Sequence, residues 1–200
     1  MPLDTLLALA VFTFATAFTP GPNNIMVTAS GVNFGFARTV PHMAGITIGF
    51  MVLVGACAAG LGAVFTAVPA LQLALKIVGS LYMLWLAWKV ANARPAEAEV
   101  DDLARPLTFL QGAAFQWVNP KAVVIGLTAI SLYVRPDHRV ADVFILLAMF
   151  GIFTVLTVVT WTGFGVALRS VLRDPRRARI FNVIMALLLV ASIVPMVWPA

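Results

Sequence analysis

The chain has 200 residues, of which 62% are apolar and only 10% charged, and its mean hydropathy is +0.99. Soluble domains carry about 25% charged residues, so this composition excludes a water-soluble domain and predicts an integral membrane protein. The net charge of +5 does not indicate a nucleic-acid partner, because the basic residues gather in short loops between apolar runs. The single cysteine, Cys57, excludes an internal disulfide and is expected to be a buried apolar residue.

Six apolar segments approach or exceed the length of about 20 residues that a helix needs to cross a bilayer. In chain order, they are expected at 3–33, 41–66, 70–91, 107–134, 140–167 and 178–198. The prolines Pro41, Pro69 and Pro106 are expected at helix starts, where proline is tolerated. The whole chain, 1–200, is expected to form one transmembrane domain, with a polar linker at 93–106 between its halves, 1–92 and 107–200.

The first segment is interrupted by the sequence FTPGPNN, in which Pro20, Gly21 and Pro22 precede Asn23 and Asn24. Two prolines around a glycine break a helix that runs through them. Broken backbone is costly in hydrocarbon unless protein or a water-filled cavity surrounds it. The break at 19–23 is therefore expected inside the protein, near the middle of the first span.

A second break is expected near 118–120, where the fourth segment reads FQWVNPK and contains Gln116, Asn119 and Lys121. Each half then has one broken helix followed by two unbroken ones, and an odd number of crossings inverts the second half. The predicted fold is an all-α integral membrane protein with six transmembrane helices in two inverted three-helix repeats, with helices 1 and 4 discontinuous. Broken helices in corresponding positions indicate a midplane binding site in a secondary transporter.

The half-helices after Pro22 and Pro120 are expected to begin close together at this midplane. Helix N-termini offer unpaired N–H groups and partial positive charge, which suit an anion such as a carboxylate. One proline kink would have a simple structural explanation, but two matching breaks favour a functional one. The predicted substrate site comprises Pro20, Gly21, Pro22, Asn23, Asn24, Gln116, Asn119 and Lys121.

Lys121 is the most specific single candidate, since an ionisable side chain at the bilayer centre indicates function. It is expected either to bind a carboxylate or to carry a proton in each transport cycle. The structural alternative is that it only contacts backbone carbonyls freed by the helix break. His42, expected at a helix start, is a second candidate for proton coupling. Lys76, near the outer end of its helix, is explained by snorkelling to the membrane surface.

Acidic side chains are missing from the depth of every predicted span, since Asp4 and Asp142 lie at helix ends. A substrate with a cationic side chain would need a buried carboxylate, so a zwitterion with a small neutral side chain is favoured. Missing carboxylates and thiols also argue against metal-cation transport. Neither a metal nor a cofactor is expected.

The distribution of Lys and Arg predicts the orientation. Nine of these residues lie in or beside the loops on one side of the predicted spans, whereas the other side has only Arg135 and Arg139. The side with nine is expected to be cytoplasmic, which places both termini outside, in the periplasm of a Gram-negative cell.

Two GxxxG pairs, Gly31 with Gly35 and Gly45 with Gly49, permit close helix contact. Internal packing is their expected role, and a homodimer is left open.

Three classes of function can be compared. A secondary transporter uses all the features above, while a passive channel or an exporter of another metabolite or drug could share the scaffold. An intramembrane enzyme or redox carrier would need a nucleophile beside a base, or two thiols. The serines in the spans and Cys57 have no evident base beside them, so no enzyme activity is expected.

Several stretches carry a resemblance to a known family: FTPGPNNIM, GFARTVPHMAGITIGF, LKIVGSLYMLWLAWKVA, FQWVNPKA and NVIMALLLVASI. The chain resembles the LysE/RhtB family of bacterial amino-acid exporters, and most of all its cysteine/O-acetylserine exporter branch. The resemblance implies six helices, an inner-membrane location and export of small neutral amino acids in exchange for protons. It departs from some basic-amino-acid exporters of the family, which use intramembrane aspartates that this chain lacks.

Overall fold

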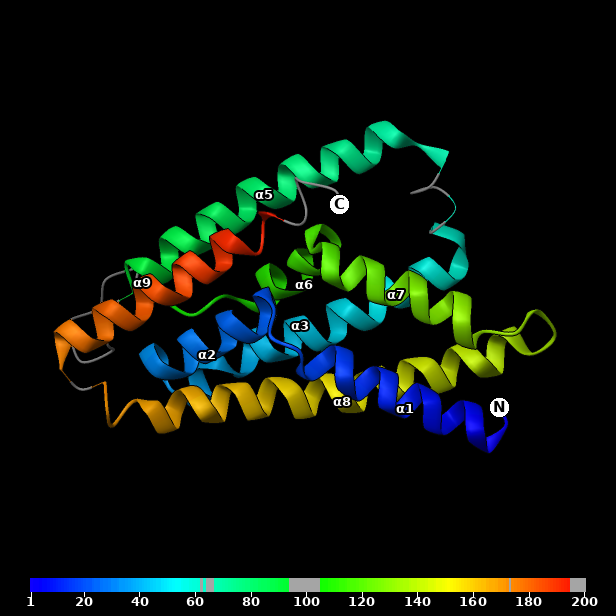
Figure 1. Cartoon of the computed structure of the whole chain (residues 1–200), viewed down its shortest axis with the longest axis horizontal. Coiled ribbons are helices and arrows are strands. Elements are labelled where there is room, and N and C mark those ends of the chain that lie inside the picture. Colours follow the sequence, from blue (N-terminus) through cyan, green and yellow to red (C-terminus); the bar gives the residue numbers. More distant parts are fainter. Residues whose placement is uncertain (62, 64–66, 94–104, 173, 195–200) are drawn as a thin grey trace.

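The computed structural model describes residues 1–61, 63, 67–93, 105–172 and 174–194, and within these ranges the chain is helical without strands. The helices are α1 (Leu3–Phe18), α2 (Pro22–Phe34), α3 (Phe36–Ala56), a π-helical turn at Cys57–Leu61, α5 (Pro69–Ala91), α6 (Phe109–Val118), α7 (Pro120–Tyr133), a 3-10 turn at Pro136–His138, α8 (Arg139–Leu168) and α9 (Pro175–Ala191). They form an elongated bundle in which α5 and α9 lie side by side along one edge (Figure 1).

Both predicted helix breaks are confirmed. The chain turns by 55° between α1, which ends at Phe18, and α2, which begins at Pro22. The second break is a single residue, Asn119, between α6 and α7. In both cases proline occupies the first position of the new helix, where its missing N–H leaves no hydrogen bond unmade.

The length and composition of the helices support a multi-pass membrane protein. Among the described residues, α3, α5 and α8 are each long and apolar enough to cross a membrane, and α1 with α2 gives a fourth crossing if the bent pair counts as one. α7 is a shorter apolar helix, and α9 ends at Ala191. Of the six expected spans, three or four are therefore supported by helix length and composition among the described residues. Some expected positions, in 41–66, 93–106 and 178–198, lie outside the described residues.

The expected start of the second span was wrong. α3 begins at Phe36 rather than at 41, because Gly35 adopts a φ of +81° and turns the chain directly from α2 into α3. Pro41 consequently lies inside the helix, where it removes one backbone hydrogen bond. Pro106 also starts no helix, since α6 begins at Phe109 behind a capping box built by Thr108 and Gln111. Pro69 does start α5.

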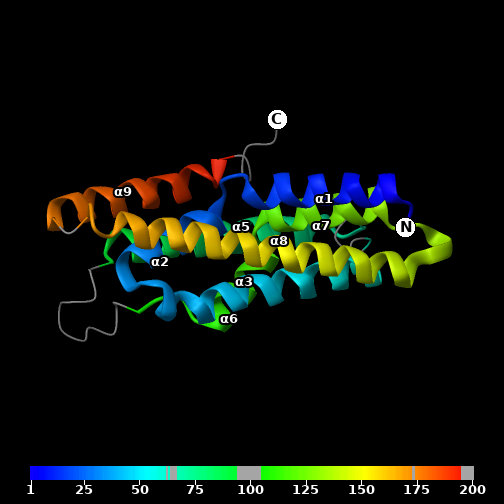
Figure 2. The ribbon, with the colours of Figure 1, turned by 90° about the horizontal axis from the view of Figure 1, so that it is seen from below.

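Glycines bring two pairs of helices into close contact. On α3, a methyl group at Gly45 would meet the carbonyl of Phe109 in α6, and one at Gly49 would meet Ala113. On α2, a methyl group at Gly31 would meet the carbonyl of Thr162 in α8, and Gly165 in turn faces Thr28. Gly31, Gly45 and Gly49 thus serve internal packing, and the pairs α3–α6 and α2–α8 lie side by side along the bundle (Figure 2).

The two ends of the bundle differ in charge. The N-terminus lies at the same end as the turn around residues 134–138 (Figure 1), where Arg135 Nε lies 2.8 Å from Asp142 Oδ2. This hydrogen bond raises the pKa of Arg135. The opposite end holds the α2–α3 turn and the start of α9, with exposed Arg38, Arg176 and Arg177.

Candidate functional site

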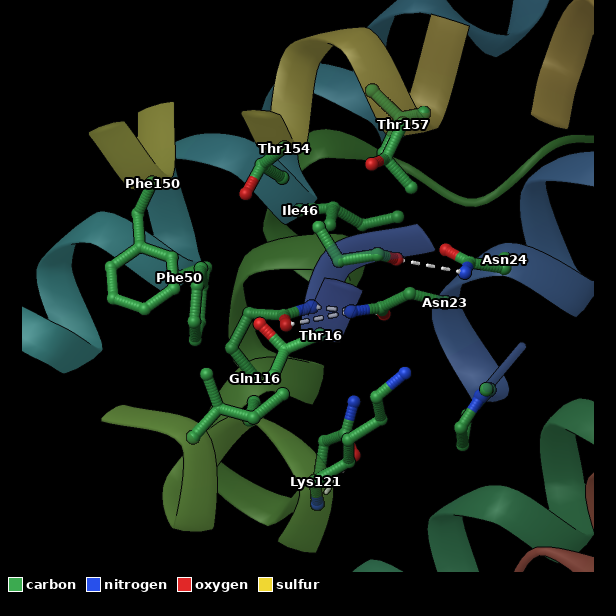
Figure 3. A pocket seen from close by; sticks show the side chains of 17 residues that line it. Thr16, Asn23, Asn24, Ile46, Phe50, Gln116, Lys121, Phe150, Thr154 and Thr157 are labelled. Carbon is green, nitrogen blue, oxygen red and sulfur yellow. Dashed lines mark hydrogen bonds between the residues drawn. The ribbon is translucent and has the colours of Figure 1, made fainter. Parts of the chain in front are cut away.

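The two helix breaks line one cavity (Figure 3). The space between its lining atoms is about 530 Å³, which includes the part that is open to the surface. The lining residues are Thr16, Ala17, Gly21, Pro22, Asn23, Asn24, Ile46, Phe50, Gln116, Asn119, Lys121, Ala122, Ile125, Phe150, Thr154, Thr157 and Val158. The structure thus brings together every residue of the predicted site except Pro20, which is exposed at the break.

A reciprocal amide pair joins the two breaks. Asn23 Nδ2 donates to Gln116 Oε1 at 2.9 Å, and Gln116 Nε2 donates to Asn23 Oδ1 at 3.1 Å (Figure 3). Gln116 Nε2 also donates to the carbonyl of Gly112 at 2.9 Å, and its side chain is fully buried. The pair fixes the start of α2 against α6, across 93 positions of sequence.

The end of α1 is held by two side chains from the breaks. Asn24 Nδ2 donates to the carbonyls of Ala17 and Thr19, each at 3.1 Å. Lys121 Nζ donates to the same carbonyl of Thr19 at 2.5 Å. The C-terminal end of a helix carries partial negative charge, so an ammonium is well placed there. In this structure Lys121 therefore donates a hydrogen bond to a carbonyl of the broken helix. This is the structural role that the sequence analysis gave as the alternative to substrate binding and proton transfer.

The two half-helix N-termini are not equivalent. At α7, the side chain of Asn119 accepts from the backbone N–H of Lys121 at 3.1 Å and so caps the helix. At α2 the N-cap is Gly21, which has no side chain to cap with. A Cβ atom at Gly21 would lie 3.2 Å from Lys121 Nζ. The start of α2 therefore has no side-chain cap and lies beside the lysine side chain.

Other lining residues were not identified from the sequence. Thr154 and Thr157 of α8 are buried, and the hydroxyl of Thr157 has no hydrogen-bond partner among the described residues. Two threonines three positions apart in an apolar run share a helix face, and that spacing could have found them. Phe50 and Phe150 form an apolar wall, with ring centroids 5.0 Å apart.

His42 lies outside this cavity. It is fully buried in α3 rather than placed at a helix start, and it lines a second cavity. Asp142, in the first turn of α8, is also fully buried, but its carboxylate accepts hydrogen bonds from the side chain of Arg135. No Asp or Glu is among the described lining residues of either cavity. Cys57 is buried within an apolar cluster, as expected.

Comparison with known proteins decides the family. The model of the LysE type translocator family matches residues 14–192. The chain belongs to the LysE family. It is 35% identical over 189 residues to the cysteine/O-acetylserine efflux protein of Escherichia coli strain K12, covering 92% of this chain and 93% of that protein.

Further relatives agree. The cysteine/O-acetylserine efflux protein of Salmonella typhi is 36% identical over the same length, with the same coverage. That of Shigella sonnei is 35% identical. No solved structure matches the chain. As a LysE-family translocator with apolar helices, the protein is a transporter and not an enzyme.

Proposed function

We propose that this LysE-family protein is a secondary transporter that exports small neutral amino acids or their derivatives across the inner membrane, in exchange for protons. Cysteine, O-acetylserine and amino acids of the homoserine and threonine type are the proposed substrates. The observation that carries the proposal is the single cavity shared by both helix breaks. The names of the relatives support the substrate class.

The cavity offers complementary groups for a zwitterion. The substrate carboxylate would bind at the uncapped start of α2, next to Lys121. Its ammonium would meet the carbonyls of Ala17 and Thr19 and the amide oxygens of the Asn23–Gln116 pair. The absence of Asp and Glu from the described lining favours neutral over cationic side chains.

A small side chain would face the opposite wall. Phe50, Phe150 and Ile46 provide apolar contact, and the hydroxyl of Thr157 is available to a polar substituent. A thiol, a hydroxyl or a short ester fits such a mixed surface better than a long charged chain.

Lys121 could connect binding to movement. A carboxylate at the start of α2 would compete with the Thr19 carbonyl for the ammonium, which would release one of the ties that hold α1 to the break. Lys121 would leave the Thr19 carbonyl either when it binds the substrate carboxylate or when it loses its proton. In both cases the angle between α1 and α2 would depend on whether substrate or a proton is bound. Inverted repeats would let the cavity open alternately to each side.

The proposed orientation follows the charges. The arginine-rich end would face the cytoplasm and the N-terminal end the periplasm. The exposed Arg38, Arg176 and Arg177 at one end of the bundle support this orientation.

Counterflow in proteoliposomes tests the function. Protein reconstituted with unlabelled O-acetyl-L-serine or L-cysteine inside should accumulate the radiolabelled compound from outside, with saturation and preference for the L-enantiomer. A carrier shows both properties, whereas flux that rises linearly with concentration would identify a channel. Absence of flux for every small neutral amino acid would reject the proposed substrate class.

A further inference from the structure

A second cavity lies between α2, α3, α5 and the segment before α6. Its lining atoms leave about 430 Å³ of space, partly open to the surface. The polar and charged lining residues are Ser30, Asn33, His42, Lys89 and Arg105. None of them belongs to the central cavity between the helix breaks.

His42 gives this cavity an unused polar group. Its side chain is fully buried, and neither ring nitrogen has a hydrogen-bond partner among the described residues. A neutral imidazole presents one donor and one acceptor, and an imidazolium two donors. Buried polar groups in native proteins are nearly always paired. A polar group that enters the cavity can supply the pairing.

The ring of His42 is held in place by its neighbours. A Cβ atom at Gly112 of α6 would lie 3.0 Å from His42 Cδ2 and 2.9 Å from the carbonyl oxygen of His42. Only a glycine at this position lets α6 close that side of the imidazole. The helix α6 therefore packs closely against the imidazole on that side.

The surroundings favour an anion. Lys89 Nζ lies over the ring of Trp85, 5.2 Å from its centroid, and Arg105 adds a second cationic side chain to the lining. Ser30 and Asn33 are already engaged, with Thr39 at 2.8 Å and Asn182 at 2.8 Å. Among the described lining residues there is no carboxylate, so an anion in the cavity would meet the positive charge of Lys89.

The two cavities lie in series along the same helices. On α2, Asn23 and Asn24 line the central cavity, and Met26 and Ser30 line the second. On α3, Ile46 lines the central cavity and His42, one helical turn away, lines the second. The second cavity lies toward the end of the bundle that carries Lys89 and Arg105, which is cytoplasmic in the proposed orientation.

We propose that the second cavity is a separate binding site for the carboxylate of a small amino acid, formed by His42 and Lys89. In the export cycle, which rests on the function proposed above, it is the site where substrate is loaded before it moves to the central cavity. Binding of a carboxylate there does not itself depend on transport, so the site can be tested alone.

Nuclear magnetic resonance of ¹⁵N-histidine-labelled protein in nanodiscs provides that test. The chain has two histidines, and His138, exposed in the turn before α8, serves as the internal reference. Titration with sodium acetate or O-acetyl-L-serine, against sodium chloride at equal ionic strength, should shift the ring signals of His42 to saturation and leave His138 unchanged. No saturable response of His42 would overturn the proposal, because His42 would then not contact a bound carboxylate.

Matched lysine variants test the second ligand. Lys89→Met should weaken the carboxylate response by about tenfold, as expected for the loss of one charged contact. Lys76→Met, on the exposed face of the same helix, should leave it unchanged. An equal response in both variants would overturn the role of Lys89.

A central-site variant separates this proposal from the transport function. Lys121→Met should keep the His42 response while losing export, because the two cavities share no lining residue. A His42 response without transport of any amino acid would reject the function and support the site. Normal transport without a shift of the His42 ring signals would reject the second binding site and would still support the proposed transport function.

Discussion

Lys121 joins the two helix breaks by contacting the end of α1 from the start of α7. Methionine has a similar length and no charge, so Lys121→Met should abolish export while the amount of protein in the membrane stays normal. Export of O-acetylserine from cells and quantitative immunoblotting of membranes measure the two quantities. Lys76→Met, at an exposed position, is the control and should export normally. Unchanged export by Lys121→Met would remove this lysine from the mechanism.

The Asn23–Gln116 pair allows a direct measurement of coupling between the two breaks. Each side chain satisfies the other, so the second substitution in a double mutant removes little that the first has not already removed. Asn23→Ala and Gln116→Ala should therefore be non-additive, with an interaction energy of about 0.5–3 kcal/mol. Equilibrium unfolding in mixed micelles of both single variants and the double variant gives this value. Additive effects would show that the pair does not link the breaks energetically.

At the residue scale, the sequence identified those residues whose type is unusual in an apolar segment. Lysine and asparagine beside prolines in an apolar run are rare enough to notice. The pair of Asn33 and Asn182, both buried and reciprocally bonded at 2.8 and 3.0 Å, was missed because its partners lie 149 positions apart. Thr157 was missed because threonine is common in apolar helices and only the fold shows which face it occupies.

At the scale of elements, two glycines on α8 offer a matched comparison. A methyl group at Gly165 would collide with the backbone of Thr28 in α2, whereas nothing lies within 4 Å at Gly163. Gly165→Ala should destabilise the protein by about 1–3 kcal/mol, because overpacking forces the helices apart. Gly163→Ala should be neutral or slightly stabilising, since alanine favours helix. Thermal unfolding of the detergent-solubilised variants measures both, and equal stability would contradict the close crossing.

The breaks themselves were predictable from sequence, and helix starts only in part. Proline blocks a helix locally, so Pro22 and Pro120 identify their own positions. Pro41 misled because the start of α3 depends on Gly35, whose positive φ turns the chain earlier. Pro106 misled because the Thr108–Gln111 capping box provides a stronger start signal three residues later. In both cases a neighbouring residue determined the boundary.

For the whole molecule, composition alone predicted an integral membrane protein, but it did not predict how many times the chain crosses the membrane. By length and apolar content, three of the described helices are candidate membrane spans, or four if the bent pair counts as one. The hydropathy of one helix does not decide whether a short helix such as α7 belongs to a crossing. A test of the proposed inverted repeat must therefore determine on which side of the membrane the N-terminus and the loops between helices lie.

Cysteine labelling answers that question. In a Cys57→Ala background, Asp4→Cys and Asp137→Cys should react with a membrane-impermeant maleimide on intact cells, because both positions are exposed at the proposed periplasmic end. Arg177→Cys, exposed at the start of α9, should react only after permeabilisation. Denatured samples labelled in parallel control for the presence of each cysteine. In the proposed topology four crossings lie between positions 4 and 137, so the two positions share a side of the membrane. Labelling of 4 and 137 from different sides would rule out this topology even if transport is confirmed.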